Sequence, residues 1–232
     1  MTIIVQARMS SQRFPGKVLT NVQGKPLLGY LLERLQLSRL VDSIIIATST
    51  DTTDDAIEQY CQRNHLPCFR GSLTNVASRF VQIIQEYKLD AFVRINADSP
   101  LMDFHVVDEC LEIFKQGKYE IVTNCFKRSF PKGQSVEVLS AQAFLRGYNA
   151  MKDPQDLEHV TQYFYKNADQ FKIYNLANTA DYSKVNLCVD TQEDFKHFEQ
   201  ILKMMKRPFL EYSWQEVVGI YNHLINESVG KS

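Results

Sequence analysis

Short apolar runs alternate along the first half of the chain with segments whose apolar residues recur at helical spacing. The runs are continuous, as buried parallel strands are, and Leu28, Leu31 and Leu35 mark one face of a helix. The predicted strands are 2–7, 43–49, 67–70 and 91–95, and the predicted helices are 26–40, 53–64, 75–87 and 104–116. This βαβαβα order predicts an α/β fold with a doubly wound, mainly parallel sheet and helices on both faces.

After Lys118 the alternation becomes less regular. The predicted strands here are 119–124, 134–140, 171–176 and 186–190, and the predicted helices are 140–150, 155–168, 191–205 and one that begins at Ser213. We find no linker or repeat, so we expect a single domain over 1–232. Residues 125–175 look like an excursion from the main sheet, and such arms often form dimers, so we expect a homodimer.

The composition excludes several broad classes of function. Twenty-six basic and 27 acidic residues give a net charge of −1, which argues against a general nucleic-acid or membrane-surface binder. No apolar stretch is long enough to span a bilayer, and the start of the chain does not resemble a signal peptide. Five cysteines without CxxC spacing indicate reduced thiols. We therefore expect a cytoplasmic protein.

The loop after the first predicted strand, "VQARMSSQRFPGKVL", carries cations and hydroxyls but no acid before Glu33. Its candidate anion-binding residues are Arg8, Ser11, Arg13 and Lys17. Arginine, lysine and hydroxyl groups in a turn are typical phosphate ligands, although a basic, solvated turn is the alternative. A P-loop is excluded because Ser11 and Val18 stand where that motif needs Gly and Ser or Thr, and a GxGxxG motif is missing.

Polar residues also stand at or just after the carboxyl ends of the other predicted strands, at the sheet edge where α/β proteins bind ligands. They are Thr48, Arg70, Asn96 and Asp98. Asp98 follows one predicted strand and Asp190 ends another, and at such positions a carboxylate could bind Mg²⁺ or cap a following helix. Two such aspartates beside a phosphate-type loop favour the metal, and hence a nucleotidyl transferase. His159 could contact substrate or pair with Glu158 or backbone.

With these residues in view, the sequence resembles the acylneuraminate/3-deoxy-octulosonate cytidylyltransferase family, and most closely its spore-coat polysaccharide biosynthesis branch. The blocks that carry the resemblance are "IIVQARMSSQRFPGKVL", "GKPLL", "RINADSPLMD", "SFPKGQSVEVLS", "EHVTQYF" and "VDTQEDF". Leu157 stands where the branch often has Arg, and Cys188 where sialic acid enzymes tend to have a second Asp. These two departures concern the sugar substrate more than the chemistry.

The resemblance implies a Rossmann-type fold like that of nucleotide-diphospho-sugar transferases, usually dimeric. It also implies a reaction in which CTP and a sugar acid give a CMP-sugar and pyrophosphate with Mg²⁺. The implied nucleotide-binding residues are Ala7, Arg8, Ser11, Arg13, Lys17, Thr48, Arg70 and Asn96. Asp98 and Asp190 are the implied metal ligands, Arg8, Lys17 and Asp98 the implied catalytic residues, and Lys132, Gln134, Glu137 and His159 the implied sugar contacts.

Two other functions stay open at this point. A glycosyltransferase would use a similar sheet, but normally needs a DxD pair, and "NADSP" offers one Asp. A nucleotide-binding protein without turnover is the other, and the presence of Arg8, Lys17, Asp98 and Asp190 argues against it. The sequence does not identify the sugar, nor does it distinguish CTP from UTP.

Overall fold

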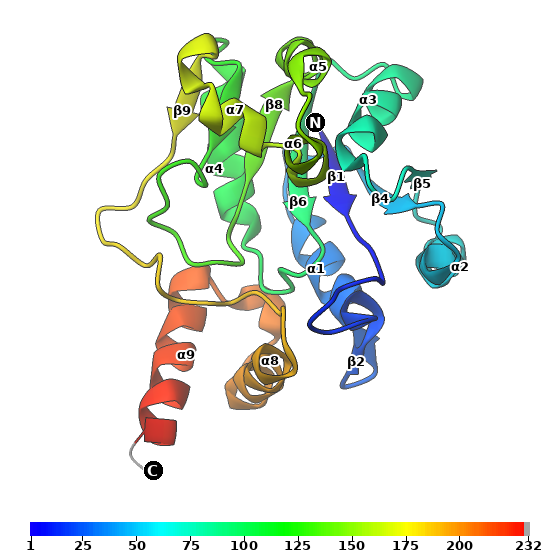
Figure 1. The fold of residues 1–232 in the computed structure, drawn as a ribbon. Helices are drawn as coiled ribbons and strands as arrows, with labels where there is room; N and C mark the ends of the chain where they lie inside the picture. Colours follow the sequence, from blue (N-terminus) through cyan, green and yellow to red (C-terminus); the bar gives the residue numbers. More distant parts are fainter. Residues whose placement is uncertain (230–232) are drawn as a thin grey trace.

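The computed structural model describes residues 1–229, and the side chains of residues 1–226. Its seven-stranded sheet has the order β5-β4-β1-β6-β8-β7-β9, and only β8 runs antiparallel to its neighbours (Figure 1). The strands are β1 (Thr2–Gln6), β4 (Ser43–Ser49), β5 (Cys68–Gly71), β6 (Ala91–Asn96), β7 (Ile121–Thr123), β8 (Glu137–Ser140) and β9 (Ile173–Asn175). A separate antiparallel pair joins β2 (Asn21–Val22) and β3 (Lys25–Pro26). The predicted mainly parallel sheet is confirmed.

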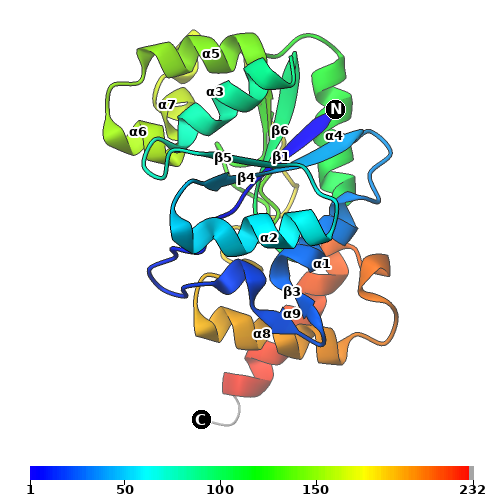
Figure 2. The ribbon, with the colours of Figure 1, turned by 90° about the vertical axis from the view of Figure 1, so that its right-hand side faces the viewer.

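Helices cover both faces of the sheet. Successive strand residues face opposite sides, and since both kinds are apolar, each side needs a covering layer. Ile3 and Val5 of β1 pack in one apolar cluster, and Ile4 packs in the other. The first face carries α1 (Leu27–Leu35), α2 (Asp55–Arg63), α4 (Phe104–Lys115), α8 (Gln192–Met204) and α9 (Trp214–Val229). The second carries α3 (Val76–Glu86), α5 (Ala141–Ala150), α6 (Pro154–His159) and α7 (Gln162–Lys166), and Figure 2 shows the two layers.

Short 3₁₀ helices complete the secondary structure: η1 (Lys17–Leu19), η2 (Thr52–Asp54), η3 (Ala168–Gln170) and η4 (Phe209–Glu211). Within residues 1–229, no helix has both the length and the apolar character that crossing a membrane requires.

The predicted helix over 155–168 is wrong in its continuity, because the backbone turns at Val160. This buried residue has φ 57° and ψ −59°, a left-handed conformation that is costly for a β-branched side chain. The amide of Thr161 donates to the carbonyl of His159 at 2.6 Å, which closes a γ-turn of positive φ. The segment therefore forms two short helices, α6 and α7.

The predicted strand at 186–190 is also wrong. Only Asn186 forms an isolated bridge, with Lys132. The amide of Leu187 donates to the backbone carbonyl of Lys132, and the amide of Val189 donates to the backbone carbonyl of Asp98, both at 2.9 Å. Because these hydrogen bonds reach two different segments, they do not build a ladder, but they do fix Asp190 beside Asp98.

Residues 125–175, expected to leave the main sheet, contribute two strands to it. They supply β8, which lies between β6 and β7, and β9, which pairs with β7. Dimerisation through this segment stays a prediction.

Candidate active site

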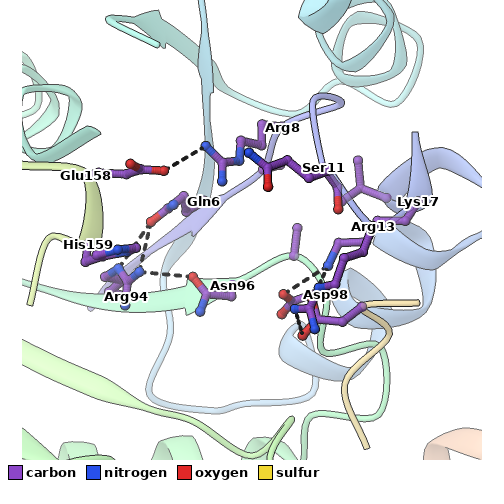
Figure 3. Close-up of a pocket in the computed structure, with 15 residues that line it drawn as sticks. Gln6, Arg8, Ser11, Arg13, Lys17, Arg94, Asn96, Asp98, Glu158 and His159 are labelled. Atoms are coloured by element: carbon purple, nitrogen blue, oxygen red, sulfur yellow. Dashed lines mark hydrogen bonds and ion pairs between the residues drawn. The ribbon is translucent and has the colours of Figure 1, made fainter. Parts of the chain in front are cut away.

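A cavity of about 490 Å³ opens at the carboxyl ends of β1 and β6, where parallel sheets place their ligand sites (Figure 3). Four segments distant in sequence meet around it: the β1 end and the loop that follows, the β6 end, the end of α6, and the residues before α8. The lining residues are Gln6, Ala7, Arg8, Ser11, Gln12, Arg13, Lys17, Val18, Arg94, Asn96, Ala97, Asp98, Glu158, His159 and Asp190.

The basic loop after β1 is anchored by the carboxylate of Asp54, which is fully buried. One carboxylate oxygen of Asp54 accepts from the amide of Met9 at 2.7 Å, and the other accepts from the amide of Ser49 at 3.1 Å. Gly16 then takes φ 75°, a left-handed conformation suited to glycine, immediately before η1. The loop therefore places Lys17 at the start of η1, where its side chain enters the cavity.

Lys17 joins two carboxylates at one end of the cavity. Its Nζ atom lies 2.7 Å from Oδ1 of Asp190 and 3.2 Å from Oδ2 of Asp98, and the residue is only 7% exposed. Arg13 lies 3.0 Å from the second oxygen of Asp190. Burial tends to raise the pKa of Asp190, but the hydrogen bond and charge of Lys17, together with Arg13, outweigh it and lower that pKa. Both carboxylates therefore converge on one buried ammonium.

Asp98 and Asp190 also have the donor chemistry that Mg²⁺ requires. Among the described residues, no group of three or more His, Cys, Asp or Glu side chains could hold a metal unaided. Mg²⁺ in nucleotide sites commonly uses one or two carboxylates and takes its remaining ligands from phosphate and water. The two aspartates therefore fit a metal that arrives with a phosphate, and they do not form a preformed protein cage.

At the other end of the cavity, Arg94 is held by three neighbours. Its Nη1 donates to Glu137, its Nε and Nη2 donate to Oε1 of Gln6 at 3.3 and 3.0 Å, and its Nη2 also donates to Oδ1 of Asn96 at 3.2 Å. Glu137 in turn accepts from the hydroxyl of Tyr165 at 2.5 Å. In Figure 3, Gln6, Arg94 and His159 lie apart from Lys17 and Asp98, with Asn96 between the two groups.

The turn at Val160 lies next to two residues that close this end of the cavity. Glu158 and His159 are the last residues of α6 and both line the cavity. Glu158 lies 3.4 Å from Nη1 of Arg8, and each of these side chains is more than 40% exposed. An ion pair this exposed contributes little to stability. Its interest is that both partners line the cavity.

The structure brings nine of the predicted site residues to this cavity. They are Ala7, Arg8, Ser11, Arg13, Lys17, Asn96, Asp98, His159 and Asp190. Their roles in binding or catalysis stay predictions.

Five predicted residues do not line the cavity, each for a local reason. Thr48 is fully buried in β4, and Arg70 pairs with Asp55 and Glu58 of α2. Gln134 is fully buried and spans from the carbonyl of Leu101 to the amide of Asp103, so its polar atoms serve the fold. Glu137 lies behind Arg94, and Lys132 is exposed and bridges to Asn186 through its backbone.

Sequence reasoning missed six lining residues: Gln6, Gln12, Val18, Arg94, Ala97 and Glu158. Strand periodicity could have found one of them. Arg94 stands two positions before Asn96, so both point to the same face of β6.

Comparison with known proteins shows the family to which the chain belongs. A family model described as cytidylyltransferase matches residues 2–217. The spore coat polysaccharide biosynthesis protein SpsF of Bacillus subtilis is 31% identical over 230 residues, which cover 94% of this chain and 92% of that protein. The 8-amino-3,8-dideoxy-manno-octulosonate cytidylyltransferase of Shewanella frigidimarina is 28% identical over 130 residues, 55% of this chain and 53% of that protein. A solved cytidylyltransferase structure from Leptospira borgpetersenii has a TM-score of 0.90 at 29% identity, covering 97% of this chain and 94% of that one.

The chain therefore belongs to the cytidylyltransferase family and is a nucleotidyltransferase. The similarity to SpsF over nearly the whole length confirms the resemblance to the spore-coat branch. Family membership therefore argues against both the glycosyltransferase interpretation and an inactive nucleotide-binding protein.

Proposed function

We propose that this protein transfers CMP from CTP to a sugar acid of the 2-keto-3-deoxy type, giving a CMP-sugar and pyrophosphate for surface polysaccharide or glycoconjugate synthesis. The observation that carries the proposal is the buried ammonium of Lys17 between Asp98 and Asp190, in a cavity edged by Arg8 and Arg13. The Shewanella relative, whose name gives an octulosonate as its substrate, supports the choice of a sugar acid.

In the proposed reaction, a hydroxyl oxygen of the sugar attacks the α-phosphorus of CTP, and the hydroxyl proton passes to water. A new oxygen–phosphorus bond forms while the bond to the β-phosphate oxygen breaks on the opposite side, and pyrophosphate leaves with the electron pair. Arg13 and Lys17 stabilise the charge that gathers on the leaving group, and Arg8 and Ser11 donate to phosphate oxygens. Asp98 and Asp190 would hold Mg²⁺, which, when bound, adds positive charge at the phosphates and lowers the pKa of a coordinated hydroxyl.

The remaining predicted site residues have subordinate roles in this proposal. Ala7 contacts the nucleotide, and His159 contacts the sugar from the end of α6. Asn96, which the resemblance assigned to the nucleotide, lies between Lys17 and His159 (Figure 3). Thr48 and Arg70 would act on the nucleotide only through β4 and the segment after it, since neither lines the cavity. Cytoplasmic location and homodimer formation stay predictions.

The test is release of pyrophosphate with Mg²⁺ and CTP against a panel of 2-keto-3-deoxy sugar acids, with UTP, ATP and GTP in parallel. We expect release with CTP and one acid, and loss of that release in Asp98→Asn. No release from any pair, in a wild-type protein that binds CTP, would contradict the proposal for these acids.

A further inference from the structure

The hydrogen bonds of Arg94 fix the orientation of two amide side chains in the cavity wall. A guanidinium group has only donors, so each amide must present its oxygen to it. Gln6 accepts through Oε1 and Asn96 accepts through Oδ1. The amide nitrogens of Gln6 and Asn96 therefore point away from Arg94, and both residues line the cavity.

The sheet brings these two amides together. Gln6 and Asn96 are direct partners in the parallel register of β1 and β6, and Arg94 is on the same face of β6 as Asn96. The result is a pair of amide donors on adjacent strands. Because Asn96 lies between Arg94 and Asp98, the pair lies beyond the Lys17 cluster in the direction of His159 (Figure 3).

Arg94 itself is held by Glu137, a residue that does not line the cavity. Its side chain is 11% exposed, and that of its partner Glu137 is 5% exposed. Tyr165 donates to Glu137, and its hydroxyl also lies 3.1 Å from Oγ1 of Thr123. Glu137 balances the charge of Arg94, so this part of the cavity selects for hydrogen-bond acceptors more than for negative charge.

We propose that Arg94 is a positioning residue, which turns Gln6 and Asn96 into paired donors for an oxygen of the second substrate that can only accept, such as a carboxylate or keto oxygen. This inference rests on the proposed function for the identity of the second substrate. A hydroxyl oxygen can also accept from these amides, but a carboxylate forms the stronger, charge-assisted hydrogen bonds.

The test uses two isosteric variants that retain the contact with Arg94. Asn96→Asp and Gln6→Glu each leave an oxygen for Arg94 but replace the amide donor with an acceptor. We expect a KM for the sugar acid about 10- to 100-fold higher in each variant, the cost of leaving a polar group unpaired, with the KM for CTP unchanged. The control is Arg146→Gln, at a half-exposed arginine that pairs with Glu120 and does not line the cavity.

Thermal unfolding provides a second readout that needs no substrate. Asn96→Asp should preserve or raise the melting temperature while Arg94 is present, because Arg94 then donates to a carboxylate. The double variant Arg94→Gln, Glu137→Gln removes both charges of the buried ion pair. In that background, Asn96→Asp should lower the melting temperature.

The outcomes separate this inference from the proposed function. If the wild type turns over no sugar acid, the proposed function fails and the unfolding comparison alone decides the orientation of the amides. An equal change in melting temperature with and without Arg94 would overturn the inference, and so would a wild-type KM for the sugar acid in both isosteric variants.

Discussion

The ammonium of Lys17 lies 2.7 Å from the carboxylate of Asp190, although 173 positions separate the two residues in sequence. Lys17 comes from the loop after β1, and Asp190 from the segment that precedes α8. Backbone hydrogen bonds from Leu187 and Val189 hold that segment, and the one from Val189 goes to the main-chain carbonyl of Asp98. The charge cluster is therefore built by the meeting of three loops at one sheet edge.

Lys17→Ala should reduce turnover by about 10²-fold or more, the usual cost of losing one preorganised charge contact, and Asp98→Asn should have a similar effect. Steady-state pyrophosphate release measures this, and circular dichroism checks the fold. Lys152→Ala is the matched control, since Lys152 is exposed and outside the cavity. Near-normal turnover in Lys17→Ala would remove this lysine from the mechanism.

The stability contributed by Asp190 should depend on pH. Lys17 and Arg13 lower the pKa of Asp190 in the folded state despite its burial. A carboxyl with a lowered folded pKa stabilises the protein above its unfolded pKa of about 3.9, and this contribution is lost as pH falls through the lower folded value. Urea unfolding of wild type and Asp190→Asn should therefore differ most above about pH 5 and converge in acid.

The control for that series is Asp169→Asn, at an exposed position that does not line the cavity. If wild type and Asp190→Asn differ by the same free energy of unfolding at pH 7 and pH 3, the ion pair with Lys17 does not contribute as described.

Gly16→Ala should destabilise the protein by roughly 1–2 kcal/mol, because φ is 75° at this position. An added Cβ would lie 3.5 Å from the Met9 side chain, an ordinary contact, so the cost comes from the backbone. Gly219→Ala, in α9 with open space around its Cβ, should instead stabilise by roughly 0.5–1 kcal/mol. Chemical denaturation measures both, and equal effects at the two glycines would argue against the left-handed conformation of Gly16.

Asp54→Ala should cost roughly 1–3 kcal/mol, since it leaves the part-buried amide of Met9 and the buried amide of Ser49 without their acceptor. We also expect a higher KM for CTP, because the basic loop loses its anchor. Asp51→Ala, which removes only the exposed cap of Thr53, should cost about 1 kcal/mol and leave that KM unchanged. An unchanged KM in Asp54→Ala would show that the loop holds its shape without this carboxylate.

The sheet and the basic loop could be predicted because their causes are local. Continuous apolar runs define β1, β4, β5 and β6, and the cations of the loop, which have no acidic residue near them in sequence, are visible in a dozen residues. The apolar residues of "NLCVD" mislead for a physical reason: Leu187 and Val189 are buried in the apolar core, but the segment does not join the sheet. Alternating burial does not require a hydrogen-bonded ladder.

The far end of the cavity depends on longer-range pairing. Arg94 meets Glu137 only because β8 returns antiparallel between β6 and β7, a register that the local pattern does not specify. Nothing around Val160 is a glycine or proline, so the turn that separates α6 from α7 has no local signal. The amide pair of Gln6 and Asn96 therefore emerges only from the assembled sheet.

The most direct test of the account is the structure of the protein with CTP and Mg²⁺ bound. We predict the triphosphate within hydrogen-bond distance of Lys17, Arg13 and Ser11, with the metal on Asp98 and Asp190 and the amides of Gln6 and Asn96 left free for the second substrate. A triphosphate bound outside this cavity, or one that leaves Lys17 and both aspartates without contact, would contradict the account.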